Sequence, residues 1–113
     1  MSRLVIVGRV VPGSEDQVAG IFGESDRTEL PQLAGVRHRS LYTLNDLYVH
    51  LIETDAGTAG VERASGHPLF LKVSQELSAY ISPYSPTWRS PRDAMARCFY
   101  SWDAPVPVPG SRG

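Results

Sequence analysis

The sequence has one cysteine, Cys98, and one lysine, Lys72. A single cysteine cannot form an internal disulfide or a thiolate metal cluster, and such scarcity is typical of a reducing cytoplasm. The chain has no apolar run long enough to span a membrane and no secretory h-region at its N-terminus, so we expect a cytoplasmic protein without membrane contact. Its formal net charge is -1, without a basic block, which argues against nucleic-acid binding through phosphate contacts.

Several sequence motifs that are typical of nucleotide-binding or metal-dependent enzymes are also missing. The sequence contains no P-loop, no dinucleotide fingerprint and no HExxH pair. Its three histidines, His38, His50 and His67, fall in different predicted elements, so we predict no metal site. No base lies near Cys98 in the sequence, and we expect this residue to be a small buried apolar side chain.

Hydrophobic patterning predicts one domain of four strands and two helical regions in the order βαββαβ. In chain order these are a strand at 3–11, a helix after Ser14, a hairpin at 35–53, a helical region at 58–81 and a strand at 95–102. This order predicts an α+β fold of the ferredoxin-like type. We assign residues 1–104 to the domain and predict a proline-rich flexible tail at 105–113.

Local signals predict where the helices begin and end. Ser14 fits the first residue of a capping box. Pro31 should end any helix there, which leaves residues 25–35 as a turn or a short extra helix. Pro68 suits the first position of a helix, and His67 before it is assigned a helix-terminal structural role.

The strand at 3–11 is apolar on both of its faces, which is typical of a strand that is covered on both sides. Two helices can cover only one face of a four-stranded sheet. We therefore predict a homodimer in which two sheets pack face to face, as in a dimeric α/β barrel.

The hairpin has a two-residue turn at Asn45 and Asp46 that predicts its register. With this turn, the facing pairs are Leu44–Leu47, Thr43–Tyr48, Leu41–His50 and Arg39–Ile52. A slip of one residue would move every side chain to the other face.

Strand alternation divides the cationic run at residues 37–39. Arg37 and Arg39 share a face with His50, whereas His38 points to the other face. Because that face is otherwise apolar, we expect the helices to cover it and the charges to line a cavity, the usual form of a small-molecule site. There, histidine can exchange protons and arginine can stabilise an oxyanion. Alternatively, Arg39 and His50 lie on an exposed face and have no function.

Two other side chains are weaker candidates. Asp26 follows the first helix and could orient His50 or take a proton; otherwise it is a solvated loop carboxylate or a turn cap. Trp88 could form the wall of an aromatic site, although such residues more often pack in a core or loop.

Five segments occur in the order and at the spacing of one known family: DRTELP at 26–31, GVRHRSLYTLNDLYVHLIE at 35–53, HPLF at 67–70, Pro-Tyr at 83–84 and FYSWDAP at 99–105. On these segments, nearly end to end, the chain resembles the second-stage aromatic polyketide cyclases of the tetracenomycin type. The resemblance implies a dimeric ferredoxin-like fold with a pocket between helices and sheet. It also implies closure of a later ring of a partly cyclised poly-β-ketone by intramolecular aldol condensation and dehydration, without a cofactor.

Residue roles follow from the same resemblance. The family's pocket residues map onto Asp26, Arg39 and His50, which would be the catalytic residues. Beside the resemblance, we predict Ser25, Thr28, Tyr48 and Trp88 as substrate-binding residues, although Thr28 and Glu29 could equally cap a short helix. The family often has a histidine directly before the aspartate, where this chain has Ser25. Either His50 carries the proton chemistry here, or the substrate differs.

Two other functions are alternatives on the same fold. One is a cofactor-free monooxygenase of anthrone-type aromatics, and the other is a non-catalytic polyketide-binding protein. A type II polyketide synthase complex is a candidate partner that the tail at 105–113 could dock, although a flexible end is the simpler interpretation.

Overall fold

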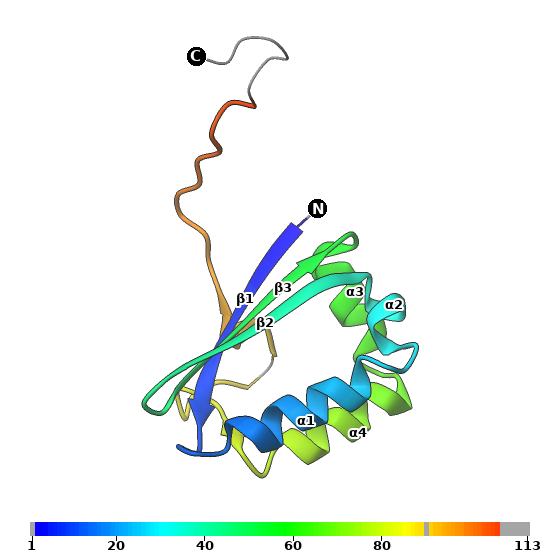
Figure 1. Ribbon diagram of the computed structural model, residues 1–113, viewed down its shortest axis with the longest axis vertical. Helices are drawn as coiled ribbons and strands as arrows, with labels where there is room; N and C mark the ends of the chain where they lie inside the picture. Colours follow the sequence, from blue (N-terminus) through cyan, green and yellow to red (C-terminus); the bar gives the residue numbers. More distant parts are fainter. Residues whose placement is uncertain (1, 90, 107–113) are drawn as a thin grey trace.

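The computed structural model describes residues 2–89 and 91–106. Its antiparallel sheet has the order β2-β3-β1-β4, β5 also pairs with β1, and the helices cover one face (Figure 1). The strands are β1 (Ser2–Val10), β2 (Val36–Leu44), β3 (Leu47–Thr54), β4 (Ile81–Ser82) and β5 (Met95–Ala96). The helices are α1 (Glu15–Ser25), α2 (Leu30–Ala34), α3 (Gly57–Ala64), α4 (Pro68–Leu77) and the 3-10 turn η1 (Pro91–Ala94). This arrangement confirms the ferredoxin-like α+β fold.

Strands β2 and β3 pair in the register that the turn predicts. Asn45 has φ 54°, a left-handed conformation that asparagine tolerates in a two-residue turn. Leu41 lies opposite His50, and Arg39 lies opposite Ile52. Alternate residues of β3 are buried beneath the helices: Tyr48, His50, Ile52 and Thr54.

A β-bulge at Arg37 corrects one prediction. The register shifts between Val36 and His38, so Val36 takes the place on the helix-covered face that we expected for Arg37. Arg37 is exposed instead, and its Nε lies 3.5 Å from a carboxylate oxygen of Asp55. One extra residue reverses the alternation on the N-terminal side of the bulge, so only Arg39 of the two arginines faces the helices.

The N-terminal cap of α4 agrees with the sequence prediction, whereas that of α1 does not. Pro68 begins α4, and the Nδ1 of His67 accepts a hydrogen bond from the backbone N–H of Leu69 at 3.1 Å, which confirms the structural role of His67. Ser14 precedes α1, but its hydroxyl donates to the carbonyl of Val11 at 2.5 Å. The predicted capping box is therefore wrong, because that hydroxyl bonds back into the preceding turn.

Helices α2 and α3 cross closely at Gly60. A Cβ at this position would overlap the backbone carbonyl of Ala34 and lie 2.7 Å from the Cβ of Ala56. Beneath the crossing, Thr54 is fully buried, and its hydroxyl donates to the Ala34 carbonyl at 3.2 Å and accepts from the Ala56 N–H at 3.1 Å. The crossing therefore depends on a residue without a side chain and on one buried hydroxyl.

The last strand is shorter than the predicted range of 95–102. Only Met95 and Ala96 pair with β1, and the chain then runs away from the sheet as an extended segment, residues 97–106, which we call the C-terminal arm (Figure 1). Cys98 lies on this arm and is exposed, so the prediction that it is buried is wrong.

The C-terminal arm exposes three aromatic side chains, Phe99, Tyr100 and Trp102. Of the predicted tail at 105–113, residues 105 and 106 are exposed and 107–113 lie outside the described residues. Within the described ranges, no helix has the length and apolar character needed to cross a membrane.

Candidate active site

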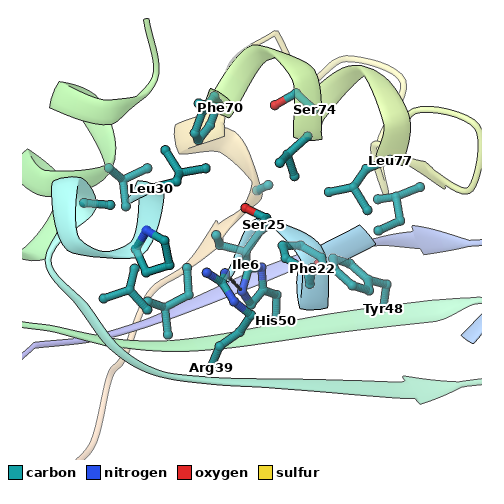
Figure 2. Close-up of a pocket in the computed structure, with 18 of the residues that line it drawn as sticks. Ile6, Phe22, Ser25, Leu30, Arg39, Tyr48, His50, Phe70, Ser74 and Leu77 are labelled. Atoms are coloured by element: carbon teal, nitrogen blue, oxygen red, sulfur yellow. Dashed lines mark hydrogen bonds between the residues drawn. The ribbon is translucent and has the colours of Figure 1, made fainter. Parts of the chain in front are cut away.

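A cavity of about 240 Å³ lies between the sheet and the helices, and we call it the central cavity (Figure 2). Most of its wall is apolar, including Ile6, Phe22, Leu30, Phe70, Val73 and Leu77. The polar side chains that reach it are Ser25, Arg39, Tyr48, His50 and Ser74. The helices thus cover the face that carries Arg39 and His50, as the hairpin register predicts.

Arg39 and His50 are in direct contact on the floor of the central cavity. Nη1 of Arg39 lies 2.9 Å from Nε2 of His50, and Figure 2 marks this bond between the two strands. A guanidinium has only donors, so Arg39 donates and Nε2 accepts. The neutral His50 ring therefore carries its proton on Nδ1.

His50 is held in its neutral form. Only 6% of the residue is exposed, and the edge of its ring meets Phe22 with the ring centroids 4.9 Å apart. Burial, and secondly the positive charge of Arg39, lower the pKa of His50 from 6.5 to about 3. We expected proton exchange near neutral pH at this residue; burial beside a cation disfavours the charged ring instead.

Asp26 contacts Arg39 from the side opposite to His50. Its carboxylate accepts from Nη2 at 2.8 Å and from Nε at 3.2 Å. The Asp26 side chain is 40% exposed and does not line the central cavity, whereas that of Arg39 is 15% exposed. The structure thus brings the three predicted catalytic residues into one chain of contacts, with Asp26 placed to orient Arg39.

Tyr48 brings a phenol to the same cavity from β3. The residue is buried, and burial raises its pKa while the positive charge of Arg39 lowers it less, so the phenol stays protonated at neutral pH. Within the described ranges its hydroxyl forms no hydrogen bond, which leaves a donor for a ligand.

The other predicted substrate-binding residues have different positions. Ser25 lines the central cavity above Arg39 (Figure 2). Thr28 does not, because its hydroxyl donates to the Ser25 carbonyl at 2.6 Å and accepts from the N–H of Leu30 at 3.2 Å, at the start of α2. Trp88 lines a neighbouring cavity instead.

Phe22 of α1 and Phe70, Ser74 and Leu77 of α4 were not predicted as part of the site. The ring centre of Phe22 lies 4.9 Å from the Cζ of Arg39, and the same ring also contacts His50. Ser74 lines the cavity from α4. Phe70 and Leu77 recur at helical spacing within the predicted helical region at 58–81, which is typical of the apolar face of a helix. The sequence did contain one signal for these residues: the apolar face of their helix must pack on the same side of the sheet as Arg39.

In the described part of the chain, no three His, Cys, Asp or Glu side chains are grouped so that they could hold a metal ion. The fold and the cavity define a class of small α+β proteins that have a largely apolar cavity between a sheet and one helix layer. Residues 2–103 match the family described as polyketide synthesis cyclase, and the chain belongs to that family.

Relatives of known name agree with this assignment. The chain is 48% identical over 105 residues to "Polyketide synthase CurG" of Streptomyces cyaneus, covering 91% of this chain and 98% of that one. It is 42% identical over 104 residues to "Tetracenomycin F2 cyclase" of Streptomyces glaucescens, covering 91% and 95%. The solved structure of that cyclase superposes with a TM-score of 0.85 over 93% of this chain and 100% of that one.

A crystal structure titled as an antibiotic biosynthesis monooxygenase is similar in fold alone. It superposes with a TM-score of 0.53 at 14% identity, over 72% of this chain and 86% of that one. At this identity the likeness extends to the ferredoxin-like architecture and not to the chemistry.

Proposed function

We propose that this protein is a cytoplasmic polyketide cyclase that closes a later ring of a partly cyclised poly-β-ketone by aldol condensation and dehydration, without a cofactor. Membership of the family and the 42% identical relative named as a tetracenomycin F2 cyclase support this role. The observation that carries it is the chain of contacts from Asp26 through Arg39 to His50, on the floor of an apolar cavity.

The largest contribution comes from folding the substrate. A poly-β-ketone is flexible and enolises readily, so its own carbons serve as both nucleophile and electrophile. A narrow apolar cavity that holds the enol carbon near the target carbonyl converts this flexible chain into a near-attack conformer. The apolar walls formed by α1, α2 and α4 supply that confinement.

Arg39 stabilises the oxyanion that develops on the attacked carbonyl. A guanidinium has five N–H donors. Nε–H and one N–H of Nη2 bind Asp26, and one N–H of Nη1 binds His50. Two N–H groups are therefore left to bind the oxyanion, with the side chain held in place from both sides.

His50 acts as a neutral hydrogen-bond donor through Nδ1–H. As a general base it would need the lone pair of Nε2, which already accepts from Arg39. A neutral imidazole N–H can polarise the attacked carbonyl and hydrogen-bond to the oxygen as the new carbon–carbon bond forms. The proton released by the attacking enol converts the alkoxide to a hydroxyl, and this hydroxyl leaves as water with the proton lost from the adjacent carbon. Asp26 is a positioning residue in this scheme, and Ser25 and Tyr48 contact the substrate. Aromatisation after water loss supplies the driving force.

The test is to supply the purified protein with the polyketide intermediate of its host pathway and to identify the product against a no-enzyme control. We expect a new aromatic ring and loss of one water. Oxygen uptake with an anthrone, without ring closure, would instead favour the monooxygenase. Tight product binding without a rate change would favour the binding protein.

A homodimer is part of the proposal. The sheet face away from the helices carries apolar side chains, among them Val5, Val7, Val49 and Leu51, and on β2 Tyr42 is 55% exposed. A second copy packed on this face would bury it, and the aromatic side chains of the C-terminal arm add further apolar surface. Sedimentation should give the mass of two chains, and the mass of one chain would contradict this. A polyketide synthase complex is proposed as a further partner.

A further inference from the structure

A second cavity of about 430 Å³ adjoins the central cavity beside the end of α4. Six lining residues belong to both cavities, among them Tyr48, Ser74 and Leu77, so the two cavities lie directly side by side, and we call the second one the second lobe. Trp88, on the loop between β4 and η1, lines the second lobe and does not line the central cavity.

The size of the central cavity indicates that a ligand uses both lobes. Pockets for drug-sized ligands occupy roughly 300 to 1,000 Å³, whereas the central cavity measures about 240 Å³. A fused aromatic system of several rings therefore needs the second lobe. Gly8 lines the second lobe, and a Cβ there would lie 3.1 Å from the Ser82 carbonyl oxygen and 3.6 Å from side-chain atoms of Tyr48 and Ile81, so the absence of a side chain leaves this space to a ligand.

A row of contacts along the sheet edge holds Trp88 in the second lobe. Nη1 of Arg9 lies 2.6 Å from a carboxylate oxygen of Asp46 in the hairpin turn. The Cζ of Arg9 is 5.0 Å from the ring centre of Tyr84, and the rings of Tyr84 and Trp88 are 6.1 Å apart. This is a cation–π contact followed by a tilted aromatic pair, and it connects the loop to β1 and to the turn.

We propose that the second lobe is a subsite for the far end of the substrate, with Trp88 as its aromatic wall. The ligand class is a flat fused-ring aromatic, or a partly cyclised precursor of one, that is longer than two rings. Its reacting end lies over Arg39 and His50, and its preformed rings lie against Trp88. Arg9 and Tyr84 are positioning residues for Trp88. The inference rests on the proposed function, because that function places the reaction in the central cavity.

The test compares the affinities of two probes, 1-naphthol with two rings and a hydroxylated tetracenequinone with four, by calorimetry. For the wild type we expect tighter binding of the four-ring probe. Trp88→Ala should weaken that probe by about 10-fold and leave 1-naphthol within about 2-fold, since only the longer ligand reaches the second lobe. Trp88→Phe keeps a ring and should retain most of the affinity. Circular dichroism checks that each variant folds.

Arg39→Met separates this inference from the proposed function, since it should weaken both probes. If it does so and Trp88→Ala weakens both probes equally or neither, the second subsite is wrong while the central site stands. If Trp88→Ala weakens only the four-ring probe and Arg39→Met changes neither, the subsite stands and the proposed catalytic site is wrong.

A kinetic measurement tests the positioning role. Tyr84→Leu removes the ring between Arg9 and Trp88 and should raise KM for the polyketide by about 3- to 10-fold with kcat little changed, because only uniform binding is lost. Tyr84→Phe keeps the ring and should behave as the wild type. A fall in kcat at unchanged KM in Tyr84→Leu would overturn the assignment.

Discussion

Protonation of His50 should destabilise the folded protein as the pH falls below neutral. The pKa of His50 is about 3 in the folded protein, against 6.5 for the unperturbed side chain. A pKa that is lower in the folded state gives stability that is fully present above about 6.5 and is lost progressively as the pH approaches 3. At pH 5, about 1.5 pH units below the unfolded value, the loss is roughly 2 kcal/mol at about 1.36 kcal/mol per unit.

Urea unfolding at about pH 7.5 and pH 5 would measure this loss, at one protein concentration because a dimer unfolds by mass action. His50→Gln is the comparison, since glutamine does not titrate and its carbonyl can still accept from Arg39. The wild type should lose ~2 kcal/mol more than this variant between the two pH values. Other groups near His50 are common to both proteins: the Arg39 cation, the Tyr48 phenol and the Asp26 carboxylate.

His38→Gln is the matched control, because His38 is exposed and bonds only to Ser40 within the described residues. It should follow the wild-type pH dependence. If His50→Gln also loses the same free energy of unfolding as the wild type, then His50 is not a buried neutral imidazole, and its role as a fixed donor fails with it.

Three further changes test the site and its support. Arg39→Met should lower kcat/KM for cyclisation by about 100- to 1,000-fold, because two oxyanion donors are lost; an unchanged rate would refute its role. Gly60→Ala should lower the free energy of unfolding by ~1–3 kcal/mol, since its methyl group overlaps α2, whereas Gly20→Ala, with nothing within 4 Å, should be neutral or stabilising. Equal stabilities of these two variants in urea would contradict the close helix crossing. Thr54→Val should cost ~1–3 kcal/mol by the same measurement, as it leaves a buried carbonyl unpaired, and an unchanged midpoint would contradict this.

The sequence predicts the site floor well because local rules determine it. A two-residue turn sets the register of the hairpin, and strand alternation then places Arg39 and His50 on one face. The bulge at Arg37 was not predictable, because a strand with one extra residue contains the same kinds of residue as a regular strand and the turn sets the register only from its own side. The position of Cys98 was missed for another reason: its segment has strand-like residues, but pairing with β1 ends at Ala96.

Roles that depend on non-local packing were harder to predict. For Thr28 the sequence left a substrate contact and a helix cap as alternatives, and the structure supports the cap, because the Thr28 hydroxyl bonds at the start of α2 and does not line the central cavity. Trp88 has the right residue type for a ligand wall, but the sequence has no signal for a second lobe. The neutral state of His50 follows from burial beneath α1 and from the neighbouring cation, neither of which a motif encodes.

The bulge at Arg37 has a consequence for how the hairpin tolerates insertions and deletions. It divides β2 into two parts whose alternation is out of phase, with the turn on one side and the α2 connection on the other. An insertion or deletion on the α2 side can be absorbed by shifting or closing the bulge, and Arg39 keeps its orientation. The same change between Arg39 and the turn would rotate Arg39 away from His50. Length variation among natural homologues should therefore gather before Arg39 and be rare after it.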